Sequence, residues 1–256
     1  MTAENILERR NRLVEQVRKN GRVSTQEASV QFGVSLETIR QDFLYLEQRH
    51  ILKKVHGGAV AWERATVEPL RKRRTENEAA KACIARRALS YVSAGDTVGL
   101  DMGSTVAALA DLLATGQGNL IVTNSLLALE KLTDSANRVY CLGGEYSAHD
   151  MAFQGEQAVS ALKKLRLDVS FLGTSGVQGR GGICSTGFHD IPVKQEFIHR
   201  SRRTVVLADS SKFSSASLVE VADWTQVDTL ITDSGIDPEQ ARQLSEKLEL
   251  VIADES

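Results

Sequence analysis

The 256-residue sequence predicts two domains, a small α+β domain followed by a larger α/β domain with a mostly parallel sheet. The charge is divided unevenly along the chain. Residues 1–74 carry 15 Lys and Arg against 9 Asp and Glu, a net charge of +6, whereas the remaining residues carry 16 Lys and Arg against 24 Asp and Glu, a net charge of −8. The apolar spacing also changes, from helical near the start to short β-branched runs alternating with helical stretches. We expect the first domain at 1–60, a charge-dense linker at 61–78 and the second domain at 79–256.

Several classes of protein are excluded at this stage. No apolar run approaches the roughly 18 residues of a membrane span, and the polar start of the chain lacks the apolar core of a secretory signal. The three cysteines, Cys83, Cys141 and Cys184, are far apart and suit a reducing cytoplasm. The sequence has no HExxH, GxxxxGK[ST] or GxSxG motif, and no GxGxxG between a strand and a helix. We therefore predict no metal, no cofactor and no catalytic residue.

The first three predicted elements are helices. Ile6, Leu13, Val14 and Val17 form the apolar face of the first, which ends before Gly21. The second begins at a Ser24-x-x-Glu27 capping box and continues to Phe32. Gly33-Val34 forms a tight turn, and Ser35 caps the third helix, at about 36–48.

The third helix has one buried and one exposed side. Ile39, Phe43 and Leu46 are spaced to form the buried stripe, and at about 100° per residue the opposite side carries Glu37, Gln41, Leu44, Tyr45 and Gln48. Thr38 and Arg40 lie on the flanks. Two helices joined by a short glycine-containing turn, the second with a polar exposed face, describe a helix-turn-helix.

A β-hairpin follows. Leu52, Val55 and Val60 have strand-like spacing around a Gly57-Gly58 turn. Lys53 and Lys54 would place ammonium groups beside the third helix, where DNA phosphates would lie. The three helices and the basic hairpin together predict a winged helix-turn-helix.

The first domain carries Val23-Ser24, Phe32-Gly33-Val34-Ser35, Thr38-Ile39-Arg40-Gln41-Asp42, Leu46-Glu47 and His56-Gly57-Gly58-Ala59. This set resembles the DNA-binding domain of DeoR-family bacterial transcription regulators. The family usually reads TIRRDL with a glycine near the helix end, whereas this chain has Gln41, Phe43 and His50 at those places. Gln41 either reads adenine, to which glutamine bonds bidentately, or is a solvated helix residue. The candidate DNA-contacting residues are Ser24, Thr25, Ser35, Glu37, Thr38, Arg40, Gln41, Tyr45, Lys53, Lys54, His56 and Gly57.

The linker contains a run of four basic residues, 71–74, which is either a second phosphate-contacting patch or a solvated helix face. A helix over 79–91 begins the second domain. Predicted strands follow at 97–101, 120–123, 139–142, 169–173, 204–209, 229–232 and 248–252, with helices between most of them, for example at 107–113, 157–165 and 192–200.

Small and hydroxyl-bearing residues follow five of these strands. Because the carboxyl ends of parallel strands share one edge of the sheet, these residues are expected to meet there. Backbone amides and a helix N-terminus at that edge favour an anion, Lys212 and Lys194 would supply cations, and Asp101 and Asn124 would bond sugar hydroxyls. The pattern predicts a site for a small phosphorylated polyol, although each such loop alone also serves as an ordinary helix cap. Its candidate residues are Asp101, Gly103, Ser104, Thr105, Thr123, Asn124, Ser125, Gly143, Gly144, Gly173, Thr174, Lys194, Asp209 and Lys212.

The second domain carries, in order, Asp101-x-Gly103-Ser104-Thr105, Thr123-Asn124-Ser125, Gly143-Gly144, Phe171-Leu172-Gly173, Asp209-Ser210-Ser211-Lys212-Phe213 and Ile231-Thr232-Asp233. This set is similar to the sensor domain of the same family. That domain is similar in turn to ribose-5-phosphate isomerase and related sugar-phosphate enzymes. The resemblance implies a ribose-5-phosphate-isomerase-like fold and a sugar-phosphate or sugar-alcohol-phosphate effector. It also implies repression of a carbohydrate-utilisation operon, relieved by that effector.

The alternative is an active sugar-phosphate isomerase that carries a DNA-binding head. Isomerisation needs a carboxylate that moves a proton between adjacent carbons. The similar isomerases have acidic residues in the loop corresponding to 173–177, and this chain has none there. Asp190 and Glu196 are the nearest carboxylates, and each is either a candidate for that role or a surface residue. We therefore favour a sensor that binds operator DNA, with two or four copies of the chain on repeated half-sites.

Overall fold

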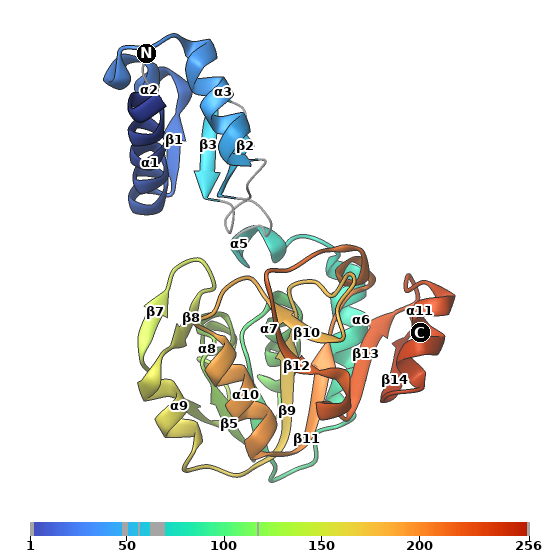
Figure 1. Cartoon of the computed structure of the whole chain (residues 1–256). Coiled ribbons are helices and arrows are strands. Elements are labelled where there is room, and N and C mark those ends of the chain that lie inside the picture. The colour runs from blue at the N-terminus through green and yellow to red at the C-terminus, as the bar shows by residue number, and fades with distance from the viewer. Residues whose placement is uncertain (1–2, 48–50, 56, 62–69, 117, 255–256) are drawn as a thin grey trace. The chain divides into compact units, whose positions relative to one another are not determined.

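The computed structural model describes residues 3–47, 51–55, 57–61, 70–116 and 118–254. The chain divides into two compact units, Met1–Glu68 and Pro69–Ser256 (Figure 1). The linker predicted at 61–78 therefore overlaps both units, because Leu70 and the residues after it belong to the second one. No helix among the described residues is long and apolar enough to span a bilayer.

The first unit is the predicted winged helix. Its elements are α1 (Ala3–Asn20), β1 (Arg22–Ser24), α2 (Thr25–Phe32), α3 (Leu36–Glu47), β2 (Leu52–Val55) and β3 (Gly58–Ala61). The β2–β3 hairpin forms as expected, and the unpredicted strand β1 pairs with β3 in an antiparallel sheet of order β1-β3-β2.

Local side-chain chemistry sets the boundaries of α2 and α3. The Ser24 hydroxyl accepts hydrogen bonds from the amides of Gln26 and Glu27, at 3.2 and 3.5 Å, and so caps α2. Gly33 then takes a left-handed conformation, with φ 61°, that ends α2. The Ser35 hydroxyl accepts from the amide of Thr38 at 3.1 Å and caps α3. These caps lie where the sequence predicts them.

The core of the first unit contains the predicted stripe of α3 and a buried carboxylate, Asp42, whose two ion pairs were not predicted. Ile39, Phe43 and Leu46 are buried with side chains of α1 and the sheet. Asp42 lies on the same helix with only 2% of its side chain exposed, and its carboxylate accepts from Nε of Arg9 at 2.6 Å and from Nε of Arg10 at 2.8 Å. A charged link therefore ties α1 to α3.

The second unit contains a seven-stranded parallel sheet. All seven predicted strands are confirmed as its members, within a few residues at each end. In spatial order they are β14 (Glu249–Ala253), β13 (Thr229–Asp233), β11 (Ser201–Leu207), β9 (Leu167–Gly173), β4 (Thr97–Leu100), β5 (Leu120–Thr123) and β6 (Arg138–Cys141).

The remaining elements cover this sheet or extend its loops. The helices are α5 (Leu70–Arg73), α6 (Glu78–Leu89), α7 (Ser104–Leu113), α8 (Leu126–Lys131), α9 (Glu156–Leu162), α10 (Ile191–Arg200) and α11 (Pro238–Ser245), with the 3-10 helices η1 (Ser210–Ser214) and η2 (Trp224–Gln226). Two antiparallel pairs were not predicted, β7 (Glu145–Ser147) with β8 (Ala152–Gln154) and β10 (Gly182–Ser185) with β12 (Val219–Asp223).

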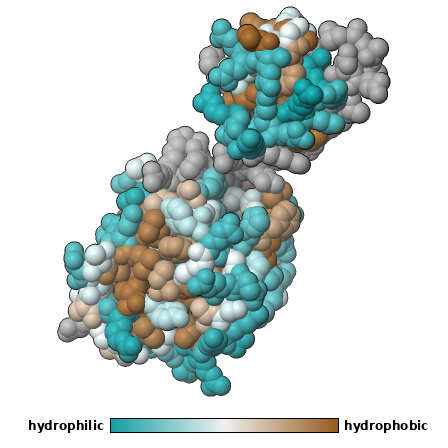
Figure 2. Space-filling view, turned by 90° about the vertical axis from the view of Figure 1, so that its left-hand side faces the viewer, coloured by the Kyte–Doolittle hydropathy of each residue, from teal (hydrophilic) through white to brown (hydrophobic). Residues whose placement is uncertain are grey.

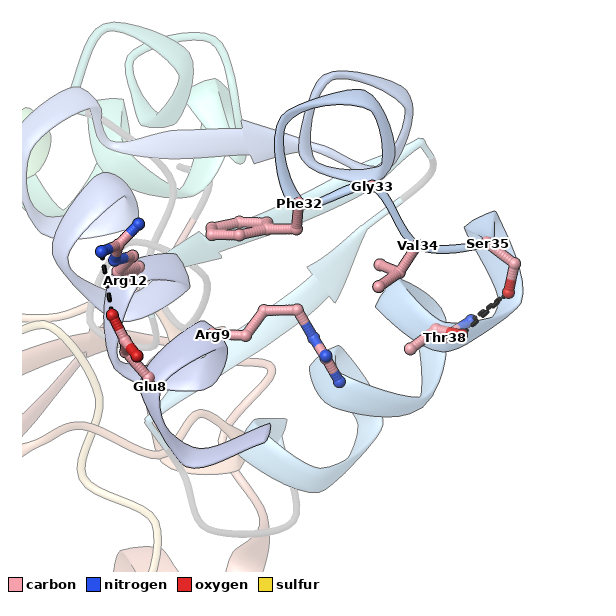
Figure 3. Close-up of a pocket in the computed structure, with 8 residues that line it drawn as sticks. All are labelled: Glu8, Arg9, Arg12, Phe32, Gly33, Val34, Ser35 and Thr38. Carbon is pink, nitrogen blue, oxygen red and sulfur yellow. Dashed lines mark hydrogen bonds and ion pairs between the residues drawn. The ribbon is translucent and has the colours of Figure 1, made fainter. Parts of the chain in front are cut away.

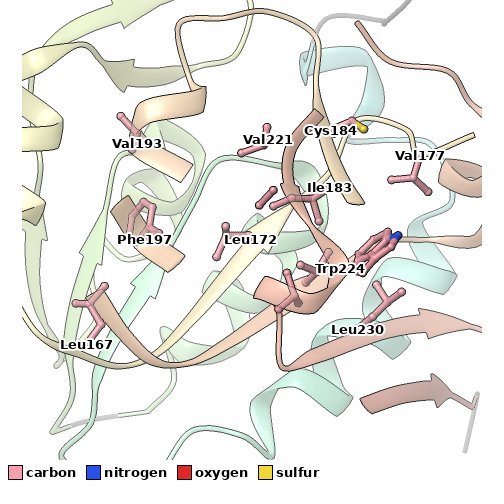
Figure 4. Close-up of a cluster of buried hydrophobic side chains, with 14 of the residues drawn as sticks. Leu167, Leu172, Val177, Ile183, Cys184, Val193, Phe197, Val221, Trp224 and Leu230 are labelled. Atoms are coloured by element: carbon pink, nitrogen blue, oxygen red, sulfur yellow. The ribbon is translucent and has the colours of Figure 1, made fainter. Parts of the chain in front are cut away.

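Apolar side chains fill both faces of the sheet, as a parallel sheet requires. One cluster joins the strands to α6 and α7, with Ile84 and Leu109 fully buried. The other joins them to α9, α10 and the β10–β12 pair, and Phe197, Ile183 and Trp224 lie within it (Figure 4). The predicted layered α/β domain is confirmed.

The strand order places a switch point between β4 and β9. From β4 the chain proceeds outward through β5 and β6, and it then returns to the other side of β4 with β9 before continuing through β11, β13 and β14. In open α/β sheets, ligands bind in the crevice outside the carboxyl ends of the strands at such a point. The residues after β4 and β9 are therefore the first place to look for a site.

One edge of the sheet is uncovered. Strand β6 pairs with β5, its other side has no partner strand among the described residues, and all four of its side chains are exposed. Large apolar side chains exposed on β6 and β7 are Val139, Tyr140 and Tyr146. Figure 2 faces the side of the second unit that carries β7 and shows apolar residues gathered on that surface. An exposed edge strand of this kind is open to pairing with another chain.

Candidate functional site

In the first unit, a groove forms where α2, α3 and the β2–β3 hairpin meet. Five predicted DNA-contacting residues line it, Ser24, Thr25, Arg40, Lys54 and Gly57, together with Gln26 and Leu36. The Arg40 and Lys54 side chains are exposed, so both cations are available to phosphate oxygens.

Glu37 organises the exposed face of α3. Its carboxylate accepts from the Gln41 amide nitrogen at 3.0 Å and forms an ion pair with Arg40 at 3.5 Å. The Gln41 hydrogen bond, with a smaller contribution from Arg40, lowers the pKa of the Glu37 carboxyl. A glutamine amide has two N–H groups and a carbonyl. The hydrogen bond to Glu37 uses one N–H of Gln41. The second N–H and the carbonyl remain, and these are the two groups with which glutamine recognises adenine.

The other predicted DNA-contacting residues that the structure describes do not line this groove. Ser35 and Thr38 line a second hollow, with Glu8, Arg9 and Arg12 of α1 (Figure 3). Tyr45 is half-buried, because the Arg10 guanidinium lies 3.5 Å from the centre of its ring. Lys53 is exposed on β2. His56 lies outside the described residues.

In the second unit, a narrow cleft opens at the switch point between β4 and β9. Seven predicted effector-binding residues line it, Gly103, Ser104, Thr105, Gly173, Thr174, Lys194 and Lys212. Sequence reasoning missed the other seven, which are Leu70, Arg73, Met102, Asp150, Ser175, Thr186 and Leu207.

Two glycines let the loops after β4 and β9 approach closely. Gly103 has φ 144°, a conformation that side chains rarely adopt. A Cβ atom on Gly173 would lie 3.0 Å from the carbonyl oxygen of Met102 and 3.7 Å from the Gly103 Cα atom. Helix α7 begins directly after Gly103, which has no side chain to cap it. The free amides and the dipole of this helix start face the cleft, where both favour an anion.

Beneath the cleft lies a buried ion pair. The Lys194 ammonium donates to the Asp101 carboxylate and to the carbonyl of Gly173, the latter at 2.9 Å. The two side chains are 3% and 0% exposed. Lys194 thus neutralises a carboxylate of the protein as well as lining the cleft. The other oxygen of Asp101, Oδ1, is buried without a hydrogen-bond partner among the described residues.

The loop after β11 carries a second carboxylate and cation. Asp209 is buried and accepts from the Asn77 amide at 3.0 Å and from the Ser211 hydroxyl. Its Oδ2 atom has no hydrogen-bond partner among the described residues, and Lys212 Nζ is 4.0 Å from it. The cleft therefore has cations in its lining, and two buried carboxylate oxygens without hydrogen-bond partners among the described residues belong to Asp101 and Asp209, which do not themselves line it.

Seven predicted effector-binding residues do not line this cleft: the buried Asp101 and Asp209, and five residues that follow β5 and β6. Thr123, Asn124 and Ser125 follow β5, and Gly143 and Gly144 follow β6, on the side of β4 away from β9. The Ser125 hydroxyl accepts from the amide of Ala128 and caps α8. Asn124 Oδ1 is buried without a hydrogen-bond partner among the described residues, as is Asp101 Oδ1.

Asp190 and Glu196 are both buried, which excludes the alternative that they are surface residues. Asp190 is 4% exposed and Glu196 is 8% exposed. Burial raises the pKa of the Asp190 carboxyl, which accepts a hydrogen bond from the Ser185 hydroxyl. Glu196 forms an ion pair with Arg200 one turn along α10. Both carboxylates lie on or next to α10, which packs against the sheet.

Comparison with known proteins identifies the family. The model of the DeoR-like helix-turn-helix domain matches residues 9–65, and that of the DeoR C terminal sensor domain matches residues 76–234. The chain is 31% identical to the glycerol-3-phosphate regulon repressor of Escherichia coli (strain K12), over 89% of this chain and 90% of the repressor. It is 32% identical to an uncharacterized HTH-type transcriptional regulator of Bacillus subtilis (strain 168), over 94% of each chain.

Among solved structures, ribose 5-phosphate isomerase A from Methanocaldococcus jannaschii is 19% identical, with a TM-score of 0.39 over 54% of this chain and 55% of the isomerase. The two family models together span both units of the chain, and the two curated relatives match it nearly end to end. The chain therefore belongs to the DeoR family of DNA-binding transcriptional regulators.

Proposed function

We propose that this regulator represses a carbohydrate-utilisation operon and that a phosphorylated sugar or sugar alcohol releases it from operator DNA. The observation that carries the proposal is the cleft at the switch point, where a helix start and Lys212 favour an anion beside buried carboxylates. The names of relatives support it, since they include a glycerol-3-phosphate regulon repressor and a putative aga operon transcriptional repressor.

The cleft suggests how such an effector binds. The phosphate group lies at the start of α7, where the amides of Ser104 and Thr105 donate to its oxygens and Lys212 supplies a positive charge. The hydroxyl groups donate to the unpartnered oxygens of Asp101 and Asp209. Each buried acceptor then gains a hydrogen bond that the free protein does not provide, so the site selects a polyol over inorganic phosphate alone.

The first unit binds operator DNA. Arg40 and Lys54 contact phosphates, and Gln41, oriented by Glu37, reads a base in the major groove. A single winged helix contacts few base pairs, so we propose that a homodimer or homotetramer binds repeated half-sites. An effector that prefers the DNA-releasing state about 100-fold shifts the equilibrium by roughly 2.7 kcal/mol, which changes a ratio of about 10:1 between the two states to about 1:10.

We infer that the chain does not catalyse isomerisation. The loop 173–177, at the entrance of the cleft, contains no carboxylate. Asp190 is buried, accepts a hydrogen bond from Ser185 and does not line the cleft. Asp150 does line it, but its two carboxylate oxygens are held by the Ser147 hydroxyl at 2.8 Å and by His149 Nδ1 at 3.0 Å. A group that moves a proton between adjacent carbons must reach the substrate. The cleft thus suits binding without turnover.

A thermal-shift screen tests the effector. We expect one or more sugar phosphates or sugar-alcohol phosphates of three to six carbons to raise the Tm of the full chain, because a ligand at about 100 times its Kd stabilises by roughly 2.7 kcal/mol. Lys212→Ala should abolish most of this rise, whereas Lys164→Ala, which removes an exposed lysine outside the cleft, should retain it. A full response in Lys212→Ala would place the phosphate site elsewhere.

A salt titration of operator binding tests the first unit. The Arg40→Ala, Lys54→Ala double variant should bind operator at least about tenfold more weakly, and its log–log salt slope should fall by about 0.9 for each DNA phosphate that it no longer neutralises. Lys19→Ala is the control, because it removes an exposed cation of the first unit that does not line the groove. Unchanged affinity and slope in the double variant would show that DNA binds to another surface.

A further inference from the structure

The segment that leads from the first unit into the second packs over the effector cleft. We call residues 70–77 the strap. Its first residue, Leu70, is only 1% exposed and lies in a small apolar cluster with three side chains of the second unit, Ala107, Leu127 and Met151. The sequence suggested a solvated, charge-dense linker here, but the strap belongs to the wall of the cleft.

The strap is also held at its other end. The Asn77 amide donates to the buried Asp209 carboxylate at 3.0 Å, and Asp209 belongs to the loop that carries Lys212. The Lys81 ammonium of α6 donates to the carbonyls of Arg73 and Glu76. Hydrogen bonds from two sides therefore fix the backbone that carries the Arg73 side chain.

Arg73 points its cationic side chain into the cleft. It lines the same space as Ser104, Thr105 and Lys212 and is half-buried. Burial lowers the pKa of the Arg73 guanidinium, and the nearby Asp150 carboxylate opposes this effect. A partly desolvated cation gains more from an anion than an exposed one does, because its hydration has already been reduced.

We propose that Arg73 binds the phosphate group of the effector and thereby couples the cleft to the strap. This inference rests on the proposed function. The planar guanidinium offers two parallel N–H donors that match two phosphate oxygens, and it completes a site formed by the start of α7 and Lys212. An occupied cleft holds the strap against the second unit. In the sequence, residues 62–69 separate the strap from β3, so the strap is the part of the second unit that follows the first unit along the chain.

Titration of inorganic phosphate into the full chain tests the contact. Arg73→Gln should weaken phosphate binding at least about tenfold, because the variant can no longer form the charge-assisted hydrogen bonds. Arg74→Gln is the matched control, because it removes the same charge from the next residue, which is exposed and lines a different cleft. Arg73→Lys keeps the positive charge but lacks the two parallel N–H donors, so it should bind phosphate with an intermediate affinity. The same variant replaces Arg73→Gln in this test if Arg73→Gln does not fold.

Limited trypsin digestion of the full chain tests the coupling. Residues 71–74 are all basic, so trypsin reports directly on how tightly the strap is held. Phosphate should slow cleavage there in the wild type and in Arg74→Gln but not in Arg73→Gln, and each variant has one cleavage site fewer than the wild type. Equal phosphate affinity in the three proteins, or no protection in the wild type despite phosphate binding, would overturn this inference alone. Absence of phosphate binding in the wild type would overturn the anion site and the proposed function with it.

Discussion

Replacing Asp42 by Ala is expected to destabilise the first unit by about 3–5 kcal/mol, which is most of the stability of a small domain. Asp42 is 2% exposed and accepts hydrogen bonds from both Arg9 and Arg10. Its removal takes away a buried carboxylate that pairs with Arg9, itself 7% exposed, and with Arg10. Urea denaturation of the full chain, followed by far-UV circular dichroism, should show a separate early transition.

Two readouts distinguish this effect from a general loss of folding. Operator binding by Asp42→Ala should be abolished, whereas the thermal shift caused by the effector should remain, because the effector cleft belongs to the second unit. Glu37→Ala is the control for charge, since it removes an exposed carboxylate from the same helix and should change stability by at most about 0.5 kcal/mol. If the denaturation curve of Asp42→Ala is the same as that of the wild type, the ion pairs of Asp42 contribute nothing to the stability of the fold.

The sequence was most informative where the physical cause of a structure is local. The inner strands of the sheet contain short apolar runs, because a parallel sheet is buried on both faces, and such runs are visible without knowledge of the fold. The caps at Ser24 and Ser35 were also predictable, because each depends on a hydroxyl and an amide two or three residues away. The β7–β8 pair was not, since Glu145–Ser147 and Ala152–Gln154 are three-residue strands without a clear alternation of apolar residues.

The candidate site was only half predictable because its residues are brought together by strand order. In the sequence, every loop that follows a strand is an equally good candidate for the binding site. The strand order of the sheet places the loops after β4 and β9 at the switch point and those after β5 and β6 to one side. The sequence shows Arg73 within the basic run 71–74 but does not place it at the effector cleft, for a similar reason. Its position depends on the packing of Leu70 against side chains 37 to 81 residues further along the chain, and no local pattern reports such packing. Asp42 and Arg9, 33 residues apart, are a third example.

Replacing Lys194 by Met is expected to cost the second unit about 3–5 kcal/mol, because it leaves the fully buried Asp101 carboxylate without its cation. For a unit of this size, that destabilisation lowers the Tm by roughly 10 °C. Methionine fills much of the volume of the lysine stem, so the effect reports charge and not a cavity. Differential scanning calorimetry of the full chain measures it, and Lys164→Met, at an exposed position, should leave the Tm within about 1 °C.

The Asp101→Asn, Lys194→Met double variant separates folding from ligand binding. Removing both charges of a buried pair is often neutral or even stabilising, so the Tm should recover most of the decrease seen in Lys194→Met. The effector should nevertheless no longer raise the Tm of the double variant, since the site then lacks the cation that lines the cleft and the carboxylate that accepts from the sugar hydroxyls. If the double variant regains stability and still responds to the effector, the pair serves only the fold and the hydroxyl acceptors must be other residues. If it regains stability without a response, the same buried pair supports the sheet and recognises the ligand, which would explain why a charged pair is retained where apolar side chains would pack as well.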